Sequence, residues 1–104
     1  MADKRYKVIV SDRAKRLLGI HIRFIAQVSK EAAARQKDEL LKAMRSLERM
    51  PERFLFFEEQ YIPSNKYHKM FVEKCYIILY QIKDDTVYID YILDCRTDYS
   101  WLLE

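Results

Sequence analysis

The sequence has 104 residues, of which 50% are hydrophobic and 34% are charged. This length suits one domain, and the balance is that of an ordinary globular protein. The single glycine, Gly19, excludes a glycine-rich nucleotide-binding loop, and no apolar run is long enough for a signal peptide or a membrane span. We therefore expect one domain over residues 1–104, located in the cytoplasm and without a membrane partner.

The net charge of +3 is unevenly distributed along the chain. Residues 1–50 hold 13 Lys and Arg against 6 Asp and Glu, whereas residues 51–104 hold 6 against 10. A basic first half would attract an acidic peptide or a nucleic acid, although these charges equally suit the solvated faces of helices. Cys75 and Cys95 have no further ligand at finger-like spacing, so we expect them to pack, with no metal site and no cofactor.

The first half of the chain predicts a strand followed by two helices. Alternation over Arg5–Val10 predicts the strand, and Ser11 is a suitable N-cap for the first helix. Its apolar stripe follows helical spacing and consists of Ala14, Leu17, Leu18, Ile22, Ile25 and Val28. After a break near residues 29–31, a second helix over 32–49 ends before Pro51. Its expected buried side consists of Ala33, Leu40, Leu41, Met44 and Leu47.

The second half changes to strand-like patterns. Arg53–Phe57 predicts a short strand, and residues 58–66 a polar loop. Three longer runs rich in Tyr, Ile and Val then predict an antiparallel meander, namely Tyr67–Val72, Cys75–Ile82 and Thr86–Asp94. Short turns at Glu73-Lys74 and Asp84-Asp85 connect them, and residues 96–104 form a tail. The expected fold is α+β, in the order β-α-α-β-β-β-β, with an antiparallel sheet packed on the N-terminal helical hairpin.

The element order and the C-terminal half resemble the RelE/ParE toxin family of type II toxin–antitoxin systems over nearly the whole chain. The similarity lies in "SLERMPERF", in the paired strands "YIILYQI" and "TVYIDYIL", and in Arg96, Asp98 and Tyr99 before "WLL". It implies growth inhibition by one of two mechanisms: cleavage of ribosome-bound mRNA, as in the RelE branch, or poisoning of DNA gyrase, as in the ParE branch. Both imply a cognate antitoxin as partner.

The resemblance also implies a set of candidate site residues, should the chain be a metal-free endoribonuclease. Such an enzyme must take the 2′-OH proton, stabilise the phosphorane charge and protonate the 5′ leaving oxygen. The basic and aromatic candidates for these steps are Lys66, His68, Lys69, Lys74, Arg96 and Tyr99. Ile77 stands where RNA-cleaving relatives carry an arginine, so this catalytic set looks incomplete.

Three of these candidates also have a structural interpretation. Arg96 suits either phosphate binding or a salt bridge to Asp94 or Asp98. Tyr99 has two residues between it and Arg96, fewer than in typical ribonucleases of the family, and would also serve to pack the tail. His68 is either a general acid or base or a surface histidine without a special role.

Three further titratable residues and one alternative function complete the expectations. His21 falls on the apolar stripe of the first helix and is expected to pack. Asp90 and Asp94 are expected on one face of their strand, where they suit a solvated acidic face better than a metal pair. The alternative to a toxin is a catalytically degenerate binding module of the same fold, which would dock an acidic amphipathic helix on its basic helices.

Overall fold

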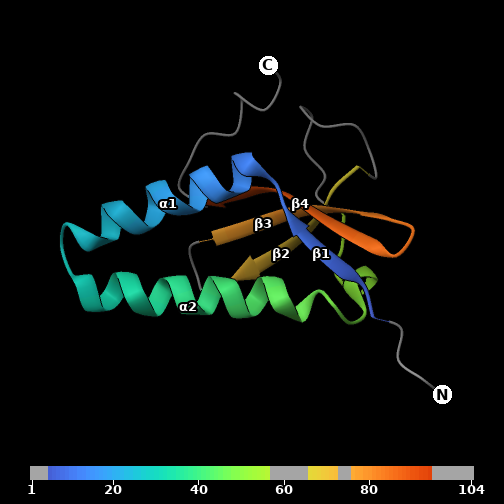
Figure 1. The fold of residues 1–104 in the computed structure, drawn as a ribbon, viewed down its shortest axis with the longest axis horizontal. Coiled ribbons are helices and arrows are strands. Elements are labelled where there is room, and N and C mark those ends of the chain that lie inside the picture. The colour runs from blue at the N-terminus through green and yellow to red at the C-terminus, as the bar shows by residue number, and fades with distance from the viewer. Residues whose placement is uncertain (1–4, 57–65, 73–75, 95–104) are drawn as a thin grey trace.

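A computed structural model describes residues 5–56, 66–72 and 76–94 of the chain. Two helices form a hairpin that lies against one side of a sheet (Figure 1). In chain order, the elements are β1 (Lys7–Val10), α1 (Asp12–Ala26), α2 (Lys30–Ser46), the 3-10 turn η1 (Pro51–Arg53), β2 (His68–Val72), β3 (Tyr76–Lys83) and β4 (Thr86–Asp94). The predicted α+β fold is confirmed.

The sheet is mixed, which corrects the predicted antiparallel arrangement. Its strand order is β1-β4-β3-β2. The meander from β2 to β4 is antiparallel, as predicted, but β1 pairs with β4 in parallel, with Val8 opposite Val87. The helical hairpin separates β1 from the meander, so β1 can join β4 in either direction. Side chains alternate in the same way in both kinds of pair, and the sequence pattern therefore could not distinguish them.

The predicted strand at Arg53–Phe57 is also wrong in the part that the structure describes. Residues 51–53 form η1, and only Phe56 makes a strand-like bridge, to His68. Pro51 favours this turn because it has no backbone N–H to donate and its φ is fixed. Residues 54–56 of the predicted strand instead lie along the outer edge of β2, where the Lys69 N–H donates to the Leu55 carbonyl.

Serine N-caps begin both helices. The Ser11 Oγ accepts a hydrogen bond from the Ala14 N–H at 3.0 Å, and the Ser29 Oγ accepts one from the Ala32 N–H at 3.1 Å. These bonds satisfy N–H groups that have no partner within the helix. The predicted break between the helices is confirmed, although α2 begins at Lys30, earlier than expected.

Removing the second cap gives a first stability prediction. Ser29→Ala is expected to lower the free energy of unfolding by about 0.5–2 kcal/mol, because the Ala32 N–H loses its acceptor. Urea denaturation followed by circular dichroism measures the change. Ser29→Asp is the control, since its carboxylate can still cap the helix. Equal loss in both variants would mean that the hydroxyl does not act as a cap.

The core lies between the hairpin and the helix-facing side of the sheet. Ala14 of α1, Leu40 and Met44 of α2, and Ile78 and Ile89 of the central strands are all buried there. Two predicted core positions are wrong: Val28 is 88% exposed and Leu41 is 39% exposed.

The exposure of these two side chains follows from the helix geometry. Val28 lies beyond the end of α1 at Ala26, so the helical spacing no longer positions it over the sheet. Leu41 follows Leu40, which is fully buried, and successive residues of a helix point about 100° apart.

The β3–β4 hairpin has a tight turn at one end and an irregularity in its middle. Lys83 pairs with Thr86 across the predicted Asp84-Asp85 turn, with Asp84 at φ 55, a conformation that aspartate tolerates better than most residues. The pairing then shifts between Leu79 and Tyr80, which leaves Asp90 as an extra residue in β4. Neither described helix is long and apolar enough to cross a membrane.

Candidate functional site

The face of the sheet turned away from the helices, called the open face below, has an apolar cluster of its own. Tyr67, Ile77, Leu79 and Leu93 are buried there, with Tyr91 packed against them. Ile77 is only 5% exposed. The strand run Tyr76–Tyr80 is apolar at every position because it is buried on both faces. Ile77, which the resemblance aligns with an arginine of the RNA-cleaving relatives, is therefore a core residue.

His68 lies on the helix-facing side of β2. Its Nδ1 is 2.8 Å from the Phe54 carbonyl oxygen. Its ring stacks between Phe56, at 4.2 Å between centroids, and Tyr80, at 5.2 Å. These contacts hold the imidazole among aromatic rings. Because side chains alternate along a strand, His68 and the neighbouring Lys69 project to opposite faces, and the structure does not bring the two candidates together.

Lys69 lies at the border of the open face and the sheet edge. Its Nζ is 5.7 Å from the ring centroid of Phe71, and both residues line a shallow groove of about 260 Å³ with Arg53, Phe54 and Leu55. Lys66 is exposed, with its Nζ 5.3 Å from the Tyr67 ring centroid. The other candidates, Lys74, Arg96 and Tyr99, lie outside the described residues, as do Cys75 and Cys95.

A polar network crosses the open face at the irregularity in β4. The Asp90 Oδ2 accepts hydrogen bonds from the Tyr67 hydroxyl at 3.0 Å and from the Gln81 Nε2 at 2.9 Å. The Arg13 guanidinium donates to the Tyr91 hydroxyl and lies 4.8 Å from the centroid of its ring. The network links the start of α1 to β3, to β4 and to the residue just before β2, and it places a carboxylate on the open face.

Asp90 affects the pKa of the neighbouring Tyr67 hydroxyl. Burial, the hydrogen bond to Asp90 and the negative charge of Asp90 all raise the pKa of the Tyr67 hydroxyl well above its usual range, against a smaller opposing effect of Arg13. Tyr67 therefore keeps its proton at neutral pH and serves as a donor, not as a base.

The sequence analysis missed this network, although the strand pattern contained a signal for it. On the helix-facing side of β4, the buried residues are Val87, Ile89 and Ile92. The first two are two residues apart and the last two are three apart, and this change of spacing indicates an extra residue in the strand. Asp90 and Asp94 consequently have separate surroundings, and no group of three or more His, Cys, Asp or Glu side chains suited to a metal ion occurs in the described ranges.

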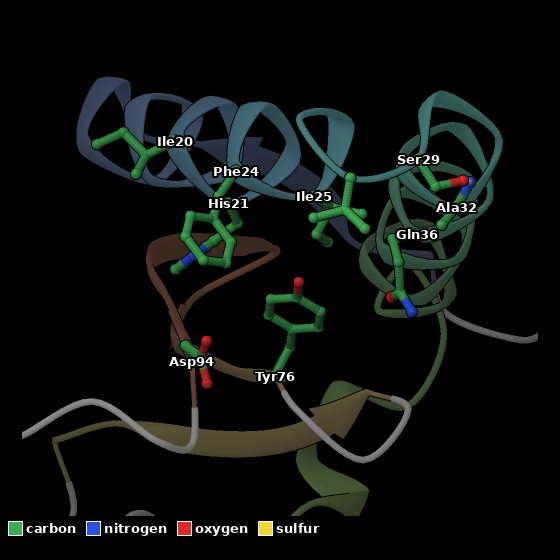
Figure 2. A pocket seen from close by; sticks show the side chains of 10 residues that line it. Ile20, His21, Phe24, Ile25, Ser29, Ala32, Gln36, Tyr76 and Asp94 are labelled. Carbon is green, nitrogen blue, oxygen red and sulfur yellow. Dashed lines mark hydrogen bonds between the residues drawn. The ribbon is translucent and has the colours of Figure 1, made fainter.

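A second feature, called the hairpin groove below, opens between the tip of the helical hairpin and the ends of β3 and β4. It has a volume of about 560 Å³ and is lined by Ile20, His21, Phe24, Ile25, Val28, Ser29, Ala32, Gln36, Tyr76 and Asp94. Figure 2 shows Tyr76 rising from the sheet between the two helices, with Ile25 above it and Gln36 to one side. The sequence analysis did not predict this groove.

His21 lies at the base of this groove. Its Nε2 is 2.9 Å from the Ile92 carbonyl oxygen, and its ring packs against Tyr76 at 5.4 Å between centroids. These contacts confirm the packing role expected from its place on the apolar stripe of α1.

Comparison with known proteins places the chain in a family. Residues 8–99 match the family model of the ParE toxin of type II toxin–antitoxin system, parDE. The solved structure of the chromosomal ParDE TA system from P. aeruginosa contains a chain that resembles this one with a TM-score of 0.72. The two are 11% identical, and the likeness covers 88% of this chain and 97% of the other, so it concerns the fold alone. No curated protein sequence gives a significant match.

Proposed function

This chain belongs to the ParE toxin family of type II toxin–antitoxin systems, and from that premise we propose that it arrests growth by inhibiting DNA gyrase and not by cleaving mRNA. The single observation that carries this choice is the burial of Ile77 in the apolar cluster of the open face. RNA-cleaving relatives carry an arginine there. An isoleucine cannot contact phosphate, and a buried side chain cannot reach a bound strand.

Three further observations on the described residues support the proposal. Asp90 places a carboxylate beside Tyr67 and Gln81 on the open face, and its negative charge opposes the binding of an RNA phosphate at that point of the face. Tyr67 keeps its proton and donates a hydrogen bond to Asp90, so it is unavailable as a general base. His68 and Lys69 project to opposite faces of β2, whereas general acid–base catalysis needs both groups within hydrogen-bond reach of one substrate.

The proposal predicts a direct effect on purified gyrase. The chain, released from its antitoxin, is expected to inhibit ATP-dependent supercoiling of a relaxed plasmid, and adding the antitoxin should restore it. Primer extension on mRNA from induced cells should show no new 5′ ends. New 5′ ends together with unaffected supercoiling would instead assign the ribonuclease mechanism. Unaffected growth with both assays negative would assign a degenerate binding module.

A further inference from the structure

A third feature, called the basic groove below, lies along α1 and takes one side chain from α2. It has a volume of about 550 Å³, and its charged lining consists of Lys15, Arg16, Arg23 and Lys37. No acidic side chain is among the described residues that line it. All four cations are exposed, and no hydrogen bond or ion pair joins their side chains to the described part of the chain. Their charge is therefore available to a ligand.

The basic groove lies on the side of α1 that is turned away from the sheet. Lys15, Gly19 and Arg23 follow one another at intervals of four residues, so they form one stripe along the helix. His21 contacts the Ile92 carbonyl of β4, and it points about 200° away from Gly19 because successive residues of a helix are about 100° apart. A ligand can therefore reach the stripe without any change in the core.

Gly19, which also lines the basic groove, is the single glycine of the chain and lies in the middle of α1. A glycine inside a helix is less favourable than an alanine. Its φ is not positive, and a Cβ added to it would meet nothing within 4 Å apart from its own helix. Neither the backbone conformation nor the packing of the described residues therefore requires a glycine. What glycine provides is backbone that a ligand can approach closely.

The arrangement of the cations indicates a long polyanion. Lys15 and Arg23 are eight residues apart, which is about 12 Å along the helix, so the positive charge extends along a line. Duplex DNA carries one negative charge per about 1.7 Å of its axis, whereas an acidic protein segment carries charge at selected positions only. The planar guanidinium groups of Arg16 and Arg23 also suit paired hydrogen bonds to phosphate oxygens. Charge density and donor geometry therefore both favour DNA.

We propose that the basic groove binds the phosphate backbone of duplex DNA, and that Gly19 lets this backbone approach α1 closely. This inference rests on the proposed function, because it takes the DNA to be the segment that gyrase holds. Arg16 and Arg23 bind phosphate oxygens, and Lys15 and Lys37 add positive charge from the two helices. The toxin then contacts the substrate of gyrase as well as the enzyme.

Fluorescence anisotropy of a short labelled DNA duplex, titrated with the full chain released from its antitoxin, measures the binding. Between about 50 and 200 mM salt, the logarithm of the association constant should fall against the logarithm of the salt concentration. The expected slope is about −1.8 to −3.6, the value for two to four neutralised phosphates. No binding at the lower salt concentration would overturn the proposal. Tighter binding of an RNA duplex of the same sequence would also overturn it, by making RNA the ligand.

Removing two cations of the basic groove tests its position. Arg16→Gln with Lys37→Gln is expected to make the slope shallower by about 1.8, since each substitution removes one phosphate contact. Lys42→Gln with Arg45→Gln is the matched control, because it removes the same charge from exposed positions that line a separate hollow of α2. The control should keep the wild-type slope. Equal changes in both double variants would mean that net charge alone attracts the DNA, and the basic groove would not be the site.

Gly19→Ala separates binding from stability. The substitution is expected to raise the unfolding midpoint by roughly 2–8 °C, because alanine favours the helix and its methyl group has room. It should also raise Kd for the duplex about fivefold or more, because the methyl group holds the phosphate backbone away from α1. A more stable variant that binds the duplex as tightly as the wild type would refute the role of Gly19.

Two further comparisons separate this inference from the proposed function. If the chain inhibits supercoiling but does not bind the duplex, the DNA site is refuted and the proposed function stands. If it binds the duplex but leaves supercoiling unaffected, the proposed function is refuted and the DNA site stands. Gyrase without DNA is the last probe: if Gly19→Ala weakens binding to this enzyme while the duplex does not bind, the groove contacts protein and the inference fails.

Discussion

Leu40→Ala is expected to lower the free energy of unfolding by about 2–5 kcal/mol, the usual cost of truncating a buried leucine. Leu40 is 0% exposed and packs in the core shared by the helices and the sheet. The neighbouring strands are held by backbone pairing and cannot collapse into the space that the lost side chain leaves. Since a domain of this size is stable by only about 5–15 kcal/mol, the loss is a large part of the total.

The same substitution at Leu55 gives the matched control. Leu55 is 77% exposed, and a surface truncation usually changes stability by less than about 0.5 kcal/mol. Urea denaturation of both variants, followed by circular dichroism, measures the difference. Similar midpoints for the two variants would contradict a core between the hairpin and the sheet, and would require the helices to pack elsewhere.

The parts of the fold that the sequence predicted are those that depend on local chemistry. The serine caps, the helical spacing of α1 and the Asp84-Asp85 turn are each determined by a few neighbouring residues. The direction of β1 depends instead on where the helical hairpin returns the chain. The failure at Arg53–Phe57 has a similar cause, because residues 55 and 56 pair with an edge of β2 that is distant in sequence.

The candidate site was predictable to a smaller extent. The residue type of Ile77 alone shows that the basic candidate set lacks the arginine that RNA-cleaving relatives carry at this position. Its burial was also predictable, since the uninterrupted apolar run of β3 indicates a strand covered on both faces. The hairpin groove was not, because its lining comes from both helices and from the ends of β3 and β4, which only the folded chain brings together.

Raising the pH above about 10 is expected to destabilise the protein steeply, through two buried tyrosines. Burial raises the pKa of Tyr80, whose hydroxyl donates to the Pro51 carbonyl, and burial with Asp90 raises the pKa of Tyr67. In the unfolded chain both hydroxyls lose their protons near the ordinary pKa of about 10. Between that pH and the higher folded pKa values, the folded chain binds more protons than the unfolded chain, so stability falls as pH rises.

Each tyrosine contributes a slope of about 1.4 kcal/mol per pH unit in this window, and its contribution is fully present below it. Urea denaturation at pH 8, 10, 10.5 and 11 measures the summed slope. Tyr67→Phe and Tyr80→Phe should each remove about one tyrosine's share, while Tyr80→Phe also lowers the value at pH 8 by about 1–3 kcal/mol because the Pro51 carbonyl loses its donor. Other groups that titrate here are common to all variants, and Tyr88→Phe controls for the loss of a surface phenol. If neither Tyr67→Phe nor Tyr80→Phe reduces the slope of stability against pH, these two phenols do not cause the loss of stability above pH 10.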